Sequence, residues 1–158
     1  MASQIAEVAL RRRISSKSDS YYASVDPLAE LARSAFPKDK SQIRNLENIA
    51  NSASRFADVL DFVKRQTGRR KPWQKGFGEG LLEALGKPLE ADAAAIFDSV
   101  RQEVGDTSLG DDDLRRIRIL LSREYIRHLS ASYLYRIGVA SARAGQGAQA
   151  DDEEGGDD

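Results

Sequence analysis

The chain has 158 residues, of which 41% are hydrophobic, and a formal net charge of −1 at pH 7. This length is typical of a single domain with a modest core. Cysteine is absent, which excludes disulfides and thiolate zinc sites. No run of about eighteen apolar residues is present, so a membrane-spanning helix is not expected.

The N-terminal segment carries no targeting signal that we can identify. Arg11, Arg12 and Arg13 are not followed by an apolar stretch, which argues against a secretory signal peptide. Because cysteine is absent as well, we expect a cytoplasmic protein. Residues 15–20, SSKSDS, have the composition of a flexible linker, so residues 1–24 are expected to form a flexible extension of the domain.

The chain is organised around a long amphipathic helix predicted from Ser41 to about Gly68. Its apolar residues recur every three or four positions and therefore form one buried face. They are Ile43, Leu46, Ile49, Ala50, Ala53, Phe56, Ala57, Leu60 and Val63. Asp39 or Ser41 is expected to cap its start, and Gly68, followed by Pro72, is expected to end it.

Four further helices are predicted around this one. Their expected ranges are residues 26–35, 73–85, 88–100 and 112–143. Pro27 and Pro88 stand where proline is favoured in the first helical turn. The last of the four segments is apolar around more than one stripe, so neighbouring helices should surround it. Residues 144–158 are acidic and rich in glycine and cannot bury a core, which predicts a disordered tail.

The fold class that follows is all-α. No segment alternates with a period of two, as a strand would, and the long patterned segments repeat near 3.6 residues. We predict a compact bundle of about five helices over residues 25–143, between the flexible extension and the disordered tail.

The sequence offers little for catalysis. His128 is the only histidine, and its place inside the last predicted helix favours a packed or partly exposed ring over a catalytic base. Asp111, Asp112 and Asp113 could bind a hard cation, but at a helix start they are better explained as caps. The run GFGEG at residues 76–80 lacks the preceding strand and following lysine of a phosphate-binding loop. We therefore predict no catalytic residue, no metal site and no cofactor, and expect the protein not to be an enzyme.

The near-zero net charge conceals blocks of opposite sign. Residues 38–75 contain ten basic and four acidic residues, whereas residues 79–113 contain ten acidic and two basic ones. Residues 115–143 hold seven arginines and one glutamate, and residues 151–158 hold six acids and no base. The overall charge therefore says little about what each surface binds.

Basic residues on two of the predicted helical segments are candidates for contacts with nucleic-acid phosphates. They are Arg44, Arg55, Lys64, Arg65, Arg69, Arg70 and Lys71 on the first segment, and Arg116, Arg123 and Arg127 on the last helix. Arg44 and Arg55 are about three turns apart and should point the same way from a continuous helix. Arg116, Arg123 and Arg127 should also point within about forty degrees of one another, because spacings of seven and eleven residues nearly complete whole turns. Trp73 lies among these cations and could stack on a base or sugar or pack into the core, and the sequence leaves both open.

Two short features in this region match a known family. Ser41-Gln42-Ile43-Arg44-Asn45-Leu46 forms a Ser-x-aliphatic-Arg-x-aliphatic helix start, and the helical segment after it ends in Gly68-Arg69. In these features the chain resembles the small helical subunit of type III-A CRISPR effector complexes. The final helix, with EYIRHLSASYLYR at residues 124–136, is similar in character and position. The N-terminal forty residues, residues 86–100 and the acidic tail have no counterpart in the family pattern, and the final helix carries more arginine than that pattern. These differences leave open the small subunit of another type III subtype or a different helical partner.

The resemblance implies a non-catalytic, all-α subunit of an antiviral ribonucleoprotein complex. Such subunits stack in several copies beside the duplex of guide RNA and target RNA, together with other effector subunits and away from any membrane. The motif match carries over Arg44 and Arg69 as backbone-contacting residues, while the other candidates come from charge geometry. Contacts to phosphate and sugar would be independent of RNA sequence, which leaves specificity to guide pairing.

Two other function classes remain open. A helical adaptor or antitoxin-like protein would use the same amphipathic helices against a protein partner and would have no RNA role. A helix-turn-helix DNA reader would need a recognition helix that suits a DNA groove. Residues 115–127 are too apolar between their arginines for that purpose.

Overall fold

A computed structural model describes the backbone of residues 3–105 and 109–153, and the side chains as far as residue 147. The prediction of an all-α fold is confirmed, since helices are the only regular secondary structure in these ranges. In chain order they are α1 (Gln4–Ser24), α2 (Asp26–Ala35), α3 (Ser41–Ser52), α4 (Phe56–Arg69), the short 3-10 helix η1 (Lys71–Gln74), α5 (Phe77–Leu85), α6 (Lys87–Val104) and α7 (Asp111–Glu153). None of the described helices combines the length and apolar character needed to cross a membrane.

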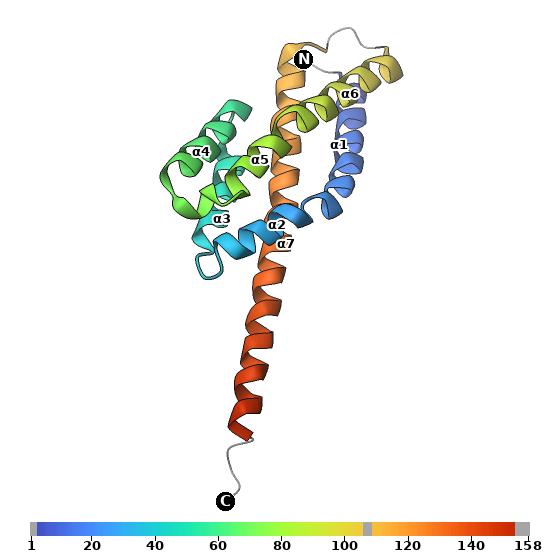
Figure 1. The fold of residues 1–158 in the computed structure, drawn as a ribbon. Helices are drawn as coiled ribbons and strands as arrows, with labels where there is room; N and C mark the ends of the chain where they lie inside the picture. The colour runs from blue at the N-terminus through green and yellow to red at the C-terminus, as the bar shows by residue number, and fades with distance from the viewer. Residues whose placement is uncertain (1–2, 106–108, 154–158) are drawn as a thin grey trace, which may run out of the picture.

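Helix α7 is the centre of the bundle. It packs against α1, α2, α3 and α6 and also contacts α4. Because neighbours lie on several sides, its buried residues occupy more than one stripe, as the sequence predicted. They include Ile117, Leu121, Tyr125, Ile126, Leu129, Tyr133 and Ile137. Figure 1 shows the C-terminal part of α7, drawn in red, extending away from the other helices.

The tail predicted for residues 144–158 begins within α7, whose backbone is helical as far as Glu153. All side chains from residue 140 to residue 147 are exposed, so the packed bundle ends before them. This part of α7 receives no support from a buried apolar face, which is where most helices in proteins obtain their stability. Residues 154–158 lie outside the described residues.

The prediction of a flexible extension at residues 1–24 is wrong for the described part, because residues 4–24 form α1. One face of α1 is buried against α6 and α7. Its residues are Ala6, Ala9, Leu10, Ile14, Ser18 and Tyr21. Ser18, in the middle of the linker-like SSKSDS, donates to Glu124 of α7 at 2.6 Å and lies 2.9 Å from Nε2 of His128. A buried serine needs such partners, and they come from a helix more than a hundred residues away.

Ion pairs attach α1 to both of its neighbours. Glu7 accepts hydrogen bonds from Arg116 of α7, at 2.7 Å, and from Arg11 one turn later in α1, at 3.0 Å. These two guanidinium groups, that of Arg116 above all, lower the pKa of Glu7 to about 2. Arg13 pairs with Glu103 of α6 at 2.6 Å. The charges of α1 therefore fix its position between α6 and α7.

Replacing Glu7 with glutamine should lower stability at neutral pH but not in strong acid. A carboxyl whose pKa falls from 4.5 to about 2 on folding stabilises the native state above pH 4.5, and this contribution is lost as the pH falls through about 2. Because both partners are partly exposed, the loss at neutral pH should be within about 1 kcal/mol. Urea unfolding of wild type and Glu7→Gln across this pH range measures the difference.

The control for this experiment is Glu83→Gln, since Glu83 is exposed and forms no ion pair in the described part of the chain. Its stability should follow that of the wild type at every pH. If the Glu7→Gln deficit persisted unchanged down to a pH of about 2, the carboxylate charge would not be its cause.

The long helix predicted from Ser41 to Gly68 is two helices, α3 and α4. Between them the backbone is extended at Ala53, with ψ 134°, and at Arg55, with ψ 137°. Residues 51–54, Asn-Ser-Ala-Ser, include side chains that compete with a helix for backbone hydrogen bonds. Apolar residues continue to recur every three or four positions across this break, so the sequence pattern did not indicate it. Arg44 and Arg55 therefore do not lie on one continuous helix, and that prediction is wrong.

Trp73, in η1, lies in the core with none of its surface exposed. Its ring packs against Phe36, Phe62 and Phe77, with ring centroids 5.6, 6.3 and 5.0 Å apart. Its indole nitrogen donates a hydrogen bond to Oε1 of Gln42 at 3.0 Å. The question that the sequence left open is answered in favour of packing, because a fully buried ring offers no face to a nucleic-acid base.

The glycines of GFGEG serve helix packing. Gly76 has a φ of +98° directly before α5, a conformation that glycine adopts without steric cost. A Cβ atom at Gly78 would lie 2.0 Å from Oγ1 of Thr67 in α4, and one at Gly80 would lie 2.7 Å from Leu28 in α2. The missing side chains therefore let α5 approach both helices closely.

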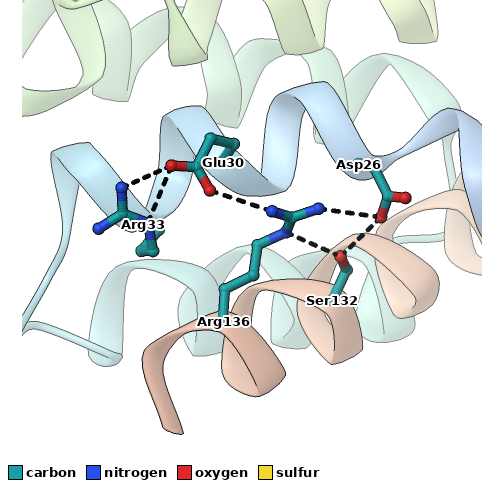
Figure 2. Close-up of polar contacts among 5 residues, drawn as sticks. All are labelled: Asp26, Glu30, Arg33, Ser132 and Arg136. Atoms are coloured by element: carbon teal, nitrogen blue, oxygen red, sulfur yellow. Dashed lines mark hydrogen bonds and ion pairs between the residues drawn. The ribbon is translucent and has the colours of Figure 1, made fainter. Parts of the chain in front are cut away.

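A polar network joins α2 to α7 near the point where α7 leaves the bundle (Figure 2). Arg136 donates to Glu30 at 3.0 Å and pairs with Asp26 at 3.5 Å. Ser132 donates to Asp26 at 3.0 Å, and Arg33 donates to Glu30 at 3.0 Å. Hydrogen bonds from Arg33, and then from Arg136, hold the pKa of Glu30 below its usual range. Both arginines are thus engaged with carboxylates of α2.

Candidate nucleic-acid interface

The ten basic residues predicted to contact RNA fall into three groups in the structure. Six are exposed on α3, on α4 and around η1 and form no ion pair within the described residues: Arg44, Lys64, Arg65, Arg69, Arg70 and Lys71. Arg55 and Arg116 line a cavity between α4 and α7. Arg123 and Arg127 are bonded to other groups of the chain.

The exposed side of α4 carries a group of cations that we call the α4 basic face, consisting of Lys64, Arg65, Arg69 and, in η1, Lys71. All four are exposed. Arg65 and Arg69 are four residues apart and are therefore neighbours on the helix surface, while Lys64 lies about 100° from Arg65 around the helix. Asp61 is also exposed one turn earlier and limits the face at that end. Cations in the last turns of a helix are favoured by its dipole, which explains part of this arrangement.

The end of α4 lies next to the start of α3. Trp73 in η1 donates to Gln42 in the first turn of α3. Hydrogen bonds from the side chains of Ser41 and Gln42 lower the pKa of Asp39. The charge of Arg70, directly after α4, also lowers this pKa, to a smaller extent. The first turn of α3 and the last turn of α4 are therefore at the same end of the helix pair.

Arg123 and Arg127 do not join the α4 basic face. Arg123 donates to the backbone carbonyl oxygens of Ala50 and Ala53, at 2.8 and 3.0 Å, and so satisfies acceptors at the C-terminal end of α3. That end of α3 is opposite to the one that adjoins the α4 basic face. Arg127 pairs with Glu124 on α7 itself. Arg123 and Arg127 therefore make contacts within the protein, although they point in a similar direction from α7.

Arg55 and Arg116 line the same cavity as Arg115 and Arg118, two arginines that were not among the predicted RNA contacts. Selection by shared helical direction omitted them, because only the contact between α4 and the start of α7 places all four around one cavity. The run Arg115-Arg116-x-Arg118 was the available signal in the sequence. This run lines a cavity because α4 packs against the start of α7, a contact that the sequence does not show.

The arrangement at His128 does not resemble a catalytic triad. The ring is partly exposed, and its Nε2 atom lies 2.9 Å from the hydroxyl oxygen of Ser18. The carboxylate of Glu124 accepts a hydrogen bond from that serine, not from the histidine. A triad acid orients the imidazole, and in the described structure no hydrogen bond between Glu124 and His128 does so.

The aspartates in the first turn of α7 make contacts at the start of this helix. Asp113 accepts a hydrogen bond from the backbone nitrogen of Gly110 at 3.1 Å, and Asp112 pairs with Arg115 at 2.7 Å. Anionic side chains at this end compensate the helix dipole. Within residues 3–105 and 109–147, no group of three or more acidic or histidine side chains is gathered closely enough to hold a metal ion.

The two parts of the motif that resembles the CRISPR small subunit both stand at helix ends. Helix α3 begins at Ser41 and α4 ends at Arg69. No family model, curated protein or solved structure matches the chain. Its function is therefore inferred from its own residues.

Proposed function

We propose that this protein binds the sugar-phosphate backbone of RNA through the α4 basic face and is a non-catalytic subunit of a ribonucleoprotein complex. The observation that supports this most is that the four cations of this face form no ion pair with a carboxylate of the described chain. Arginines of α1, α2 and α7 are, by contrast, commonly paired with carboxylates. A cluster of cations attracts a polyanion, whose bound counterions are released on binding.

Binding should be independent of RNA sequence. The α4 basic face offers ammonium and guanidinium groups, and Trp73, the nearest candidate for stacking, is buried. Phosphate contacts fix the position of a protein on nucleic acid but carry no sequence information.

The specific assembly that we propose is a type III CRISPR effector complex in the cytoplasm. The helix start at Ser41 with Arg44 and the helix end at Gly68-Arg69 support this assignment, as they lie at one end of the α3–α4 pair. Each copy would contact only a few phosphates of the guide–target duplex and would bind weakly alone. Several copies held side by side would bind strongly, because tethering raises the effective concentration of each site.

A variant carrying Lys64→Gln, Arg65→Gln and Arg69→Gln tests the proposal. We expect the affinity of the full chain for duplex RNA to depend less steeply on salt. The slope of log affinity against log salt should be smaller in magnitude by about 2 to 3, roughly one for each lost phosphate contact. The affinity should fall equally for unrelated RNA sequences. The matched control is Lys87→Gln, Arg101→Gln and Arg143→Gln, which removes the same charge from exposed residues elsewhere.

Equal slopes for the two triple variants would show that net charge alone governs binding and would reject the α4 basic face. A loss that depends on RNA sequence would contradict a backbone-only interface. Circular dichroism establishes that both variants retain their helices.

The alternative of a helical protein adaptor is favoured by a different observation. Tyr22 and Tyr135 are 75% and 73% exposed and line a depression of about 360 Å³ between α1, α2 and α7. Exposed aromatic residues are typical of protein interfaces. If Tyr22→Ser with Tyr135→Ser abolished incorporation into the complex, while the lysine and arginine variant bound RNA like the wild type, the adaptor function would be the better assignment.

A further inference from the structure

The C-terminal part of α7 carries an exposed strip of residues that begins in the bundle and continues along the segment that projects from it (Figure 1). The residues recur at steps of three or four and therefore lie on one side of the helix. Leu134 is 46% exposed and Tyr135 is 73% exposed, so the strip includes two large apolar side chains in contact with solvent. We call it the α7 strip, and its residues are Arg127, Ala131, Leu134, Tyr135, Gly138, Ala142 and Gly145.

The projecting part of α7 lacks a packing partner within the described chain. Every side chain from residue 140 to residue 147 is exposed, yet the backbone is helical as far as Glu153. Isolated helices shorter than about 12 to 15 residues are marginal in water. Gly145 and Gly147 weaken this one further, because glycine loses more backbone freedom in a helix than other residues. A second helix packed along the α7 strip would supply the contacts that stabilise it.

The charge of α7 changes sign along this part of the helix. Residues 127–143 contain three arginines and no acidic residue, whereas residues 144–153 contain three acidic residues and no basic one. If a second copy of α7 lay beside the first in the opposite direction, each basic half would face an acidic half. Parallel helices would bring like charges together. The stretch is therefore complementary to itself under a two-fold rotation, as the interface of a symmetric dimer must be.

Helix α3 adds a cation beside the basic half of this stretch. Ala50 accepts a hydrogen bond from Arg123, and Glu47 accepts one from Ser130, so α3 and α7 run in opposite directions. Arg44 is one turn before Glu47 on the same side of α3 and so lies further toward the projecting part of α7. Its side chain is exposed and forms no ion pair within the described residues. An acidic segment of a second copy would neutralise it.

The middle of the α7 strip suits close contact between two helices. Gly138, Ala142 and Gly145 have little or no side chain. The distance between packed helix axes is about 8 to 10 Å and depends on the side chains at the contact. A two-fold axis near residue 142 would place these small residues opposite one another and would leave Leu134 and Tyr135 beside the partner's projecting segment.

We propose that the α7 strip is the interface of a homodimer in which the α7 helices of two copies pack antiparallel. Leu134 and Tyr135 of each copy pack against the projecting helix of the other, and its acidic residues 151–153 lie near Arg44 and Arg127. The contact between two such helices is small, so the dimer dissociates readily. The α4 basic face takes no part, and the proposal does not depend on RNA binding.

Sedimentation equilibrium of the full chain over a range of concentrations tests the apolar part of the interface. The wild type should show a monomer–dimer equilibrium. Leu134→Ser with Tyr135→Ser should raise the Kd by roughly ten-fold or more, because each substitution occurs twice in a two-fold interface. The matched control is Ile5→Ser with Val8→Ser on α1, which also removes two exposed apolar side chains and should leave the Kd unchanged.

A charge exchange tests the direction of the helices. Asp151→Lys, Asp152→Lys and Glu153→Lys together should weaken the dimer, and so should Arg44→Glu with Arg127→Glu, because each set places like charges opposite one another. The chain that carries all five substitutions should dimerise again, since opposite charges then face each other. In a parallel dimer each set would keep like charges together, so neither would raise the Kd. Added salt should weaken the wild-type dimer by screening these charges.

Three results would overturn the proposal. A wild-type chain that remained monomeric at about 1 mM would have no dimer of useful affinity. An unchanged Kd in Leu134→Ser with Tyr135→Ser would place the contact elsewhere on the protein. Failure of the five substitutions to restore the dimer would contradict antiparallel helices. Circular dichroism establishes that each variant keeps the helices of the bundle.

Discussion

Replacing Trp73 with alanine should lower the free energy of unfolding by about 3 to 5 kcal/mol, the cost of deleting a large buried aromatic side chain. The indole is completely buried and packs against three phenylalanines, Phe36, Phe62 and Phe77. These rings come from the loop after α2, from α4 and from α5. Since domains are stable by only about 5 to 15 kcal/mol, this one substitution removes a large part of the total. Urea unfolding at constant m-value measures it.

Trp73→Phe and Gln42→Leu separate packing from hydrogen bonding. The phenylalanine keeps an aromatic ring in the cluster but loses the 3.0 Å bond to Gln42, and the leucine removes the acceptor. Gln42 is partly exposed, so in Trp73→Phe water can replace the lost donor, whereas Gln42→Leu leaves the buried indole N–H without a partner at a cost of about 1 to 3 kcal/mol. Both variants should therefore cost less than the alanine. If Trp73→Ala reduced RNA binding while unfolding at the wild-type urea concentration, Trp73 would be a stacking residue and the packing assignment would be wrong.

Helix ends marked by proline, glycine or a cap could be predicted from the sequence. Pro27 and Pro88 stand in the first turns of α2 and α6, as expected. The α3 start at Ser41 and the α4 end after Gly68 also agree with the prediction. These signals are local, since each residue acts on its own backbone conformation or on the adjacent turn.

Features that depend on distant partners could not be predicted. The buried face of α1 includes Ser18, which counts as polar in any search for an apolar stripe but is satisfied by Glu124 and His128 of α7. The break between α3 and α4 is stabilised by Arg123, also from α7. In both places the hydrogen bonds come from residues far along the chain, so the local sequence alone gave the wrong prediction for these two segments.

The same limit applies to the candidate sites. Charge counting found the cations of α4, since their exposure follows from the helical period, but it could not distinguish a cation with a carboxylate partner from one without. Arg116 is paired with Glu7, which is 109 residues away. Arg118, which lies two residues further, has a buried atom without a partner. Only the packing of α1 and α4 on α7 separates these two arginines.

Replacing Arg123 with methionine should destabilise the protein by about 2 to 3 kcal/mol, because hydrogen bonds from charged donors each contribute about 1.5 to 3 kcal/mol and water recovers part of the loss. Methionine retains the apolar stem of the side chain but leaves the carbonyl oxygens of Ala50 and Ala53 without their partner. The end of α3 should therefore fray, and hydrogen exchange should become faster there than elsewhere in the bundle. Urea unfolding measures the loss of stability.

Arg127→Met on the same helix is the matched control. Arg127 is exposed and pairs only with Glu124 within the described structure, so its loss should cost less than about 1 kcal/mol. The two arginines were both candidates for RNA contact, and the structure gives them different expected outcomes. Arg123→Met should lose stability while the folded protein keeps its salt-dependent RNA binding. A variant that instead unfolded like the wild type but bound RNA more weakly, with a flatter salt slope, would show that Arg123 contacts phosphate rather than the end of α3.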